Sequence, residues 1–287
     1  MSLVPMMREL QCGRYVLDLT RPRIMGIVNL TDDSFSGDGW QGQAEAAIAH
    51  GLRLADEGAD MLDLGAESSR PGAAPVSAQQ EIDRLLPVLQ GLATCGVPLS
   101  VDTTKPEVMR MVLANGADMI NDIHALCAPG ALELLAESAA GVCLMHAQGI
   151  PQTMQQNPQY ADVVRDVADF LAARVTAAAQ AGIAPSRVCV DPGFGFGKTP
   201  AHNLRLLHHL DQIPPQLSML KMPLLVGLSR KSVLGVVTGR GPTQRVAAGI
   251  AAHVLAMVKG ARILRVHDVA ATRDAVAIYN AVEMMDD

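Results

Sequence analysis

Residues 98–123, PLSVDTTKPEVMRMVLANGADMINDI, contain the unit whose repetition decides the fold. An apolar run at Pro98–Asp102 is followed by a helical pattern over 105–115 and then by a second apolar run at Met119–Ile123. Pro106 suits the first turn of the helix. Runs that are apolar throughout, without polar alternation, are expected of parallel strands covered on both faces. This stretch therefore predicts a strand–helix–strand unit of a parallel sheet.

The same unit recurs along the chain. Strands are predicted at Ile24–Leu30, Met61–Gly65, Pro98–Asp102, Met119–Ile123, Val142–His146, Val188–Asp191, Leu224–Ser229 and Ile263–His267. Helices are predicted near 43–57, 77–94, 105–115, 130–139, 160–181, 200–210, 243–259 and 271–284, with Gly58, Gly116, Gly182 and Gly260 as C-terminal stops. With no Pro/Ser-rich linker between them, these units predict an α/β fold, a single-domain (β/α)8 TIM barrel over 21–287. A doubly wound sheet is the alternative, which periodicity alone leaves open.

The segment before the first barrel strand has a separate role in this prediction. Residues 1–20 are expected to form an N-terminal extension, in which Arg14–Thr20 forms a short hairpin closing the bottom of the barrel.

Composition excludes several classes of protein. The chain has 287 residues, and 49% of them are apolar, which excludes a disordered chain. Its 23 Lys+Arg against 29 Asp+Glu give a net charge of −6, which argues against binding to nucleic acid or to an anionic membrane. Aromatic residues make up only 3%, which argues against a base-stacking surface. Five cysteines without a CxxC pair, and no basic and apolar leader, favour a soluble cytoplasmic protein with reduced thiols.

Polar side chains stand at the ends of nearly all the predicted strands. They are Asn29, Asp63, Asp102, Asn121, His146, Asp191, Ser229 and His267, with Glu67 just beyond the second strand. In a barrel these ends converge on one face, where active sites of this architecture lie. Asp102, Asn121 and Asp191 suit an amino-substituted heterocycle that offers N–H donors and a carbonyl. A metal pair or an acid–base dyad is the alternative, although the histidines lack HxH or HExxH spacing.

Basic side chains follow three of the same strands. They are Arg70, Arg230, Lys231, Arg265 and His267. Because side chains two residues apart share one face of a strand, Arg265 and His267 are expected to point into the barrel together. Cations gathered at one mouth of an acidic chain indicate an anionic ligand, and arginine favours phosphate. The interpretation as an ordinary surface charge is strong for Arg230 and weak for Arg265 and His267, which interrupt an apolar strand.

Three loops at the predicted mouth carry further polar groups. The loops over 31–39 and 67–72 offer hydroxyls and an arginine suited to phosphate, while Asn29 and Asp33 could supply oxygen ligands to Mg²⁺ on that phosphate. The string GFGFGKT at 193–199 ends like a P-loop, but three residues separate its outer glycines where four are needed. It is interpreted as a mobile loop with Phe194 or Phe196 covering an aromatic substrate.

Eight strings taken together resemble the dihydropteroate synthase family of the bacterial folate pathway, over about Arg23 to Val282. They are MGIVNLTDDSFS, DLGAESSRPGA, SVDTTKPEVM, INDI, LMH, DPGFGFGK, LVGLSRKS and RVHD. The resemblance implies a transferase that condenses 6-hydroxymethyl-7,8-dihydropterin pyrophosphate with p-aminobenzoate, giving 7,8-dihydropteroate and pyrophosphate. It also implies Mg²⁺, a homodimer and a sulfonamide target.

The resemblance assigns roles by position. Pterin binding falls to Asp102, Asn121, Asp191 and Lys231; pyrophosphate binding to Ser69, Arg265 and His267; the p-aminobenzoate pocket to Phe35, Arg70, Pro71, Phe196 and Ser229; and Mg²⁺ to Asn29 and Asp33. The chain departs from the family pattern at Asp32, where proline is usual, over Gly37–Trp40, at Ala66, where glycine is common, and at Ser69, which replaces threonine but keeps its hydroxyl.

Three other functions compete with this one. A methyltetrahydrofolate-dependent methyltransferase would share the pterin-binding acids without needing the SSRPG and RVHD anion set. A degenerate paralogue would bind pterin without turnover. Lys231 as the Schiff-base lysine of an aldolase is the third.

Overall fold

Eight parallel strands close into a barrel in the computed structural model, which describes residues 7–30, 39–68, 75–150, 152–213 and 222–283. In order around the barrel they are β10 (Ala261–Val266), β3 (Arg23–Asn29), β4 (Met61–Gly65), β5 (Leu99–Asp102), β6 (Met119–Asp122), β7 (Gly141–Met145), β8 (Val188–Asp191) and β9 (Leu224–Val226). This order confirms the predicted (β/α)8 barrel and excludes the doubly wound sheet. Each predicted strand is present, with shifts of a few residues at the ends.

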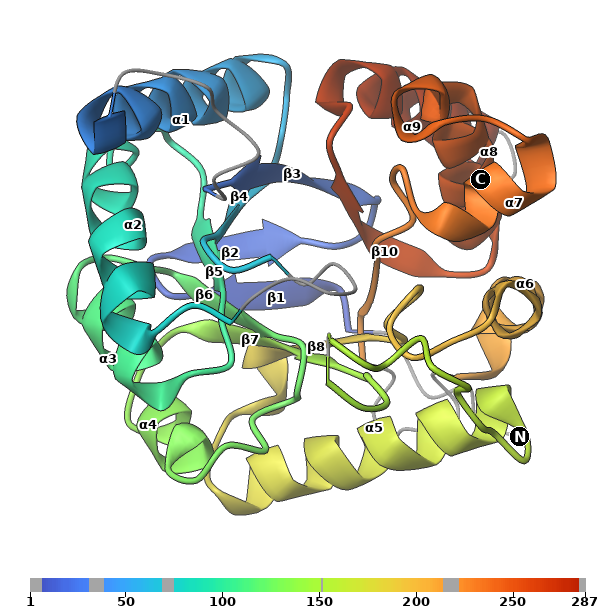
Figure 1. The fold of residues 1–287 in the computed structure, drawn as a ribbon, viewed down its shortest axis with the longest axis horizontal. Helices are drawn as coiled ribbons and strands as arrows, with labels where there is room; N and C mark the ends of the chain where they lie inside the picture. The colour runs from blue at the N-terminus through green and yellow to red at the C-terminus, as the bar shows by residue number, and fades with distance from the viewer. Residues whose placement is uncertain (1–6, 31–38, 69–74, 151, 214–221, 284–287) are drawn as a thin grey trace.

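Helices surround the barrel on its outside (Figure 1). They are α1 (Gly39–Asp56), α2 (Ala78–Gly91), α3 (Pro106–Ala114), α4 (Ala131–Ala136), α5 (Val163–Gln180), α6 (Pro200–His208), α7 (Ser232–Thr238), α8 (Val246–Val258) and α9 (Val269–Glu283). Single 3₁₀ turns lie at Pro185–Arg187, Leu210–Gln212 and Pro242–Gln244. The sequence prediction missed α7, which lies between the seventh barrel strand and α8.

Local chemistry fixes several helix boundaries. Ser77 caps α2 in a reciprocal arrangement with Gln80, and Pro106 occupies the first turn of α3 as predicted. The four glycines expected to stop helices all have a positive φ, between 95° and 99°.

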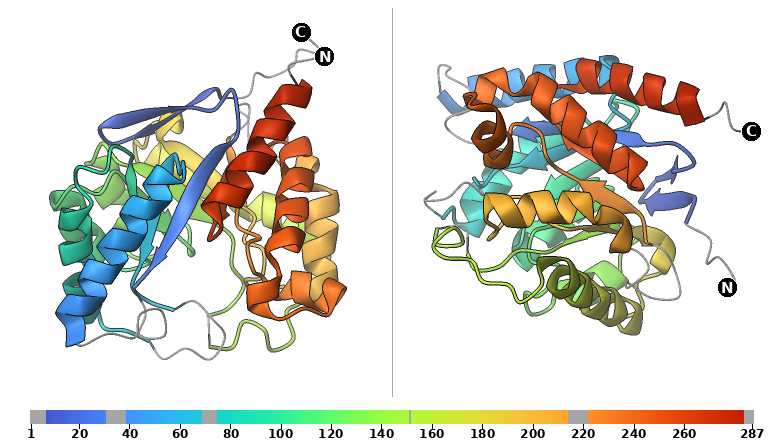
Figure 2. Two further views of the ribbon diagram at one scale, coloured as in Figure 1. Left: turned by 90° about the horizontal axis from the view of Figure 1, so that it is seen from above. Right: turned by 90° about the vertical axis from the view of Figure 1, so that its right-hand side faces the viewer.

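The bottom of the barrel interior is apolar and rich in sulfur. One buried cluster joins the hairpin residues Leu10, Cys12, Leu17 and Leu19 to Met25, Met61, Met119, Cys143, Cys189, Leu225 and Ile263 on the barrel strands. The hairpin pairs β1 (Glu9–Cys12) with β2 (Tyr15–Asp18) and lies across one end of the barrel (Figure 2). The predicted bottom hairpin is therefore confirmed, although it starts earlier than the expected Arg14.

Polar residues enter the interior two positions further along the same strands. Two positions separate the members of each pair, which are Met61 and Asp63, Met119 and Asn121, Cys189 and Asp191, and Ile263 and Arg265. Because side chains alternate along a strand, each pair shares the inner face, and the second member lies nearer the carboxyl end. The barrel therefore passes from an apolar base to a polar mouth within two residues per strand.

Within the part of the chain that the structure describes, no helix combines the length and the apolar character needed to cross a membrane.

Candidate functional site

Arg265 bridges two carboxylates at the mouth of the barrel. Its Nε lies 2.6 Å from Oδ2 of Asp63, and its Nη2 lies 3.0 Å from Oδ2 of Asp102. Asp63 is fully buried, whereas Arg265 and Asp102 keep 18% and 20% of their side chains exposed. The guanidinium thus joins strands β4, β5 and β10 and leaves part of its surface open to the mouth.

The amide of Asn121 is oriented by the same buried carboxylate. Its Nδ2 donates to Oδ2 of Asp63 at 3.1 Å, while Ser100 Oγ donates to Oδ1 of Asp63 at 2.6 Å. Oδ1 of Asn121 is buried and has no hydrogen-bond partner among the described residues. Buried acceptors are normally satisfied, so this oxygen is available to a ligand.

Two further acceptors carry altered acidities. Oδ1 of Asp191 accepts the backbone N–H of Gly193 at 2.7 Å, and burial raises the pKa of the Asp191 carboxyl to about 6. Burial also raises the pKa of Asp102 to about 7, although the positive charge of Arg265 opposes this rise. Perturbed acids grouped in a mouth are typical of functional sites.

Lys231 lies opposite these acids and immediately precedes α7. Its Nζ is 4.2 Å from the centre of the Phe196 ring. Burial lowers the pKa of Lys231 to about 8, and the nearby charge of Arg265 acts in the same direction. The structure therefore brings Lys231 and Phe196, two predicted site residues, into direct contact.

The lysine of the GFGFGKT string has a structural task. Lys198 is 2% exposed, and its Nζ lies 2.9 Å from the Gly193 carbonyl oxygen, 3.1 Å from that of Phe196 and 2.9 Å from Nδ1 of His146. Burial lowers the pKa of Lys198 to about 7 and that of His146 to about 3. Bound to backbone carbonyls, this lysine does not point outward as a phosphate-binding lysine would, in agreement with the rejection of a P-loop.

Other bonds hold the same loop in place. Tyr160 Oη donates to the Gly197 carbonyl at 2.8 Å, and Asn203 Oδ1 accepts the Gly195 N–H at 2.7 Å. Phe194 is 1% exposed and belongs to the main core. The expectation that either phenylalanine could cover the substrate is thus corrected: Phe194 is buried in the core, whereas Phe196 contacts Lys231.

Ser229 and His267 meet on the other side of the mouth. Ser229 Oγ is 3.0 Å from Nδ1 of His267 and accepts the His267 backbone N–H at 3.2 Å. Burial, together with the charges of Arg230 and Arg265, lowers the pKa of His267 to about 3, so its ring is neutral at pH 7. Arg230 forms an ion pair with Asp268 at 2.6 Å, as expected of a surface charge.

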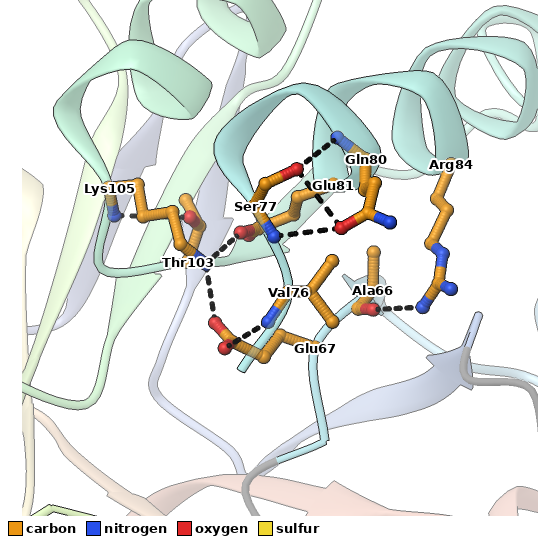
Figure 3. A network of polar contacts seen from close by, with 9 residues as sticks. All are labelled: Ala66, Glu67, Val76, Ser77, Gln80, Glu81, Arg84, Thr103 and Lys105. Atoms are coloured by element: carbon orange, nitrogen blue, oxygen red, sulfur yellow. Dashed lines mark hydrogen bonds and ion pairs between the residues drawn. The ribbon is translucent and has the colours of Figure 1, made fainter. Parts of the chain in front are cut away.

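A second charged network, which the sequence analysis missed, lies beside the mouth (Figure 3). Lys105 Nζ contacts Glu67 Oε2 at 2.5 Å and Glu81 Oε2 at 2.6 Å. The other oxygen of Glu67 accepts the Val76 N–H at 3.0 Å. Glu67 was noted at the end of its strand, but Glu81 falls within a helix and gave no signal of burial.

Of the remaining predicted site residues, Asn29 lies within the described part of the chain. Asn29 is the last residue of β3 and is partly exposed. Asp33, Phe35, Ser69, Arg70 and Pro71 lie outside the described residues. Among the described residues, no group of three or more His, Cys, Asp or Glu side chains is arranged to hold a metal ion.

The described mouth therefore presents acceptors and cations to one ligand. Asp102, Asp191 and the free Oδ1 of Asn121 can accept from N–H groups, while Lys231 and Arg265 can hold a carbonyl or an anion. A flat heterocycle with an anionic substituent satisfies both sets.

Comparison with known proteins agrees with this chemistry. The profile of the family described as "Pterin binding enzyme" matches residues 25–267. Dihydropteroate synthase of Neisseria meningitidis serogroup B is 49% identical over 278 residues, covering 95% of this chain and 96% of the relative. That of Escherichia coli strain K12 is 45% identical over 266 residues, covering 92% and 93%.

Solved structures show the same likeness. Xanthomonas albilineans dihydropteroate synthase with 4-aminobenzoic acid superposes with a TM-score of 0.89 at 52% identity, covering 96% of this chain and 98% of the other. The Burkholderia cenocepacia enzyme complexed with 7,8-dihydropteroate gives 0.87 at 47% identity, covering 97% of each. The Yersinia pestis enzyme with a sulfonamide drug gives 0.90 at 45% identity, covering 96% and 99%.

Proposed function

The chain belongs to the pterin binding enzyme family, and from this premise we infer that it acts as a dihydropteroate synthase. It is a transferase of folate biosynthesis that condenses 6-hydroxymethyl-7,8-dihydropterin pyrophosphate with p-aminobenzoate to give 7,8-dihydropteroate and pyrophosphate. The bond from the methylene carbon to the pyrophosphate oxygen breaks, and pyrophosphate leaves with the electron pair. The bond from that carbon to the amine nitrogen forms, and the amine loses a proton.

Acidic and basic side chains from strands far apart in the sequence lie together in one mouth, and this observation is the main support for the function. Asp63 and Arg265 are separated by 202 positions in sequence, yet Nε of Arg265 lies 2.6 Å from Oδ2 of Asp63. Such a site can hold a ring by its N–H groups and an anion by its charge at the same time.

We propose that the pterin is held by Asp102, Asn121, Asp191 and Lys231. In support, the first three present acceptor oxygens and Lys231 presents a donor to the same space. The pterin ring can spread the positive charge that develops as the carbon–oxygen bond breaks, so cleavage can precede attack. Positioning is then the main contribution of these residues.

We propose that the departing pyrophosphate is held by Arg265 and His267, with Ser69. Nη1 of Arg265 has no hydrogen bond to the described residues, which leaves that nitrogen for an anion. His267 is neutral at pH 7 and can donate a hydrogen bond without adding charge. Fixed donors aimed at developing negative charge lower the barrier of such a step.

We propose that p-aminobenzoate binds between Phe196 and Ser229, with Phe35, Arg70 and Pro71 completing the pocket. In support, the Phe196 ring lies 4.2 Å from Nζ of Lys231, and the Phe196 backbone carbonyl accepts a hydrogen bond from Lys198. The aniline nitrogen is already nucleophilic, so no activating base is required.

We propose Mg²⁺ as the cofactor, held by Asn29 and Asp33. Asn29 fits this role because its amide oxygen is a hard ligand at the carboxyl end of β3, next to β10, whose extension carries His267. Mg²⁺ in proteins commonly takes one or two protein ligands together with substrate phosphates. When bound there it would neutralise charge on the pyrophosphate. Isothermal titration of Mg²⁺ in the presence of pyrophosphate, with Asn29→Ala as the variant, tests this.

We propose that the chain forms a homodimer through its last helices. Six large apolar side chains on three consecutive helices are exposed: Val236 and Val237 on α7, Leu255 and Val258 on α8, and Ile278 and Val282 on α9. Exposed apolar patches of this kind mark protein interfaces. Light scattering should give twice the chain mass, and Leu255→Glu should reduce it to one. We also propose a cytoplasmic location, on account of five cysteines suited to a reducing compartment.

A pyrophosphate-release assay tests the function as a whole. Release should require the pterin pyrophosphate, p-aminobenzoate and Mg²⁺ together, and omission of any one should abolish it. Thermal stabilisation by the pterin without release would identify a non-catalytic binding paralogue. Methyl transfer from methyltetrahydrofolate would identify the methyltransferase.

A further inference from the structure

A carboxylate beneath the proposed pterin site has no assigned role in the reaction. We propose that Asp63 is a positioning residue, which fixes the side-chain amide of Asn121 so that Oδ1 faces the pterin as a hydrogen-bond acceptor. This inference rests on the proposed pterin site and adds to it the reason for its donor and acceptor pattern.

Three strands direct donors onto this one carboxylate. Ser100 on β5 donates to Oδ1 at 2.6 Å, while Asn121 on β6 and Arg265 on β10 donate to Oδ2 at 3.1 Å and 2.6 Å. Asp63 is fully buried, so water does not compete for these bonds. The carboxylate is therefore enclosed by donors and has no exposed surface of its own at the mouth.

This enclosure leaves one orientation for the Asn121 amide. If the amide were rotated by half a turn, its oxygen would face the Asp63 carboxylate, and two acceptors would meet without a proton between them. With Nδ2 on Asp63, Oδ1 is the atom left over, and it is buried without a partner among the described residues. An orphan acceptor of this kind calls for a donor from a ligand. The N–H and amino groups of a dihydropterin are such donors.

An uncharged residue at position 63 would not give the same result. A carboxylate accepts on both oxygens, whereas an amide accepts on one side and donates on the other. With asparagine at this position, an N–H group would face at least one of the donors from Ser100, Asn121 and Arg265. The orientation of Asn121 would then be free to change.

The test is Asp63→Asn, with pterin affinity as the readout. We expect the Kd for the pterin pyrophosphate, by calorimetry without p-aminobenzoate, to rise about tenfold or more, as for one lost hydrogen bond to a buried group. The KM for p-aminobenzoate should change less than about twofold, because Asn121 is proposed to bind the pterin and not p-aminobenzoate.

Asp118→Asn is the matched control. Asp118 is also a buried carboxylate that binds an arginine, with Arg14 Nε at 2.9 Å and the Leu99 N–H at 3.1 Å, but it lies at the bottom of the barrel. This variant should lose stability and keep the pterin Kd of the wild type. Equal loss of pterin affinity in both variants would show that Asp63 has a structural role alone and overturn the proposal.

A double-mutant cycle tests the route through Asn121. In an Asn121→Ala background, Asp63→Asn should add much less to the pterin Kd than it does in the wild type, since the acceptor it positions is gone. Full additivity would overturn the proposal. If wild type fails to release pyrophosphate, the proposed function is wrong; if wild type turns over and Asp63→Asn binds pterin normally, this inference alone is wrong.

A measurement on the wild type covers the case in which Asp63→Asn does not fold. The side-chain NH₂ protons of Asn121, identified by their loss in Asn121→Ala, should exchange slowly with solvent before and after pterin binding. Rapid exchange in the ligand-free chain would overturn the proposal, because it would show that the amide is not held.

Discussion

The two ends of the barrel interior differ in chemistry, although only two residues separate them on each strand. The bottom is apolar and the mouth is polar. At the bottom, Met61, Met119 and Cys189 pack against the hairpin, and burial of apolar surface stabilises the fold. At the mouth, Asp63, Asn121 and Asp191 stand in the next layer of the same strands. The base of the barrel thus supplies stability, while the mouth holds charged and incompletely satisfied groups ready for a ligand.

Each end contains a buried carboxylate bound to an arginine, which sharpens the contrast. At the bottom, both oxygens of Asp118 contact the Arg14 side chain, at 2.9 Å each, and each also accepts a backbone N–H. At the mouth, Arg265 divides its donors between Asp63 and Asp102. The bottom pair closes a structure, whereas the mouth pair leaves an arginine nitrogen and an asparagine oxygen free for substrate.

Arg265→Ala should have the largest effect, because it removes the arginine proposed to hold the departing pyrophosphate. The catalytic rate should fall about a thousandfold, equivalent to about 4 kcal/mol of transition-state stabilisation. Folding should survive with a lower free energy of unfolding, because the fully buried Asp63 loses its ion-pair partner. Steady-state pyrophosphate release and a thermal melt measure the two quantities. Unchanged turnover would refute the leaving-group role.

Met61→Ala should lower stability and leave activity unchanged, because it opens a cavity at the base of the barrel, where Met61 is fully buried. The free energy of unfolding should fall by about 3 kcal/mol, as for other buried large-to-alanine changes. The kcat and KM of the remaining folded enzyme should be those of wild type. Urea denaturation and initial rates give the answer, and a selective loss of activity would contradict the division between the two ends.

Lowering the pH should act on the mouth through Asp191. Its pKa is raised from 3.8 to about 6, so the carboxylate is lost as the pH falls through 6. The kcat/KM for the pterin pyrophosphate should then drop about tenfold per pH unit below that value. Protonation of Asp191 has the opposite effect on stability. Between pH 6 and 3.8 the folded state binds this proton more readily than the unfolded state does, so the contribution of Asp191 to the free energy of unfolding rises as the pH falls.

The substrate pyrophosphate also titrates, so Asp191→Asn is the control for this profile. The variant should have a lower kcat/KM throughout and should lack the contribution of Asp191 to the acid limb. Superimposable profiles for the two proteins would assign the limb to the substrate or to Asp102, whose pKa is raised to about 7.

Tyr160→Phe should have the smallest effect. It removes the bond to the Gly197 carbonyl at the fixed glycine-rich loop but leaves the four contacts of Lys198 in place. The free energy of unfolding should fall by about 1 kcal/mol. Denaturant titration measures this, with the KM for p-aminobenzoate as a second readout. A large rise in that KM would show that Tyr160, rather than Lys198, holds Phe196 in place.

Much of the fold could be predicted because parallel strands buried on both faces leave long apolar runs. The polar residues that interrupt these runs at Asp102, Asn121, Asp191 and Arg265 also marked the mouth correctly. Helix α7 was missed because SVLGVVT is short, rich in valine and contains a glycine, a composition that favours strands over helices.

The site was harder to predict wherever a polar side chain binds another group of the protein and not the ligand. Lys198 resembles a ligand-binding lysine in sequence, yet it binds backbone carbonyls, since its neighbours become known only once the loop is folded. Lys105 and Glu81 lie on ordinary helical patterns, and their pairing depends on how α2 and α3 pack. Asp63 was noted at a strand end, but its donors come from three other strands.

A crystal structure with dihydropterin pyrophosphate bound tests the central claim most directly. We expect ring N–H groups to donate to Asp191 and to Oδ1 of Asn121, with the pyrophosphate against Arg265 and His267. A ring that turns no donor toward Asn121, or a pyrophosphate bound away from Arg265, would contradict it.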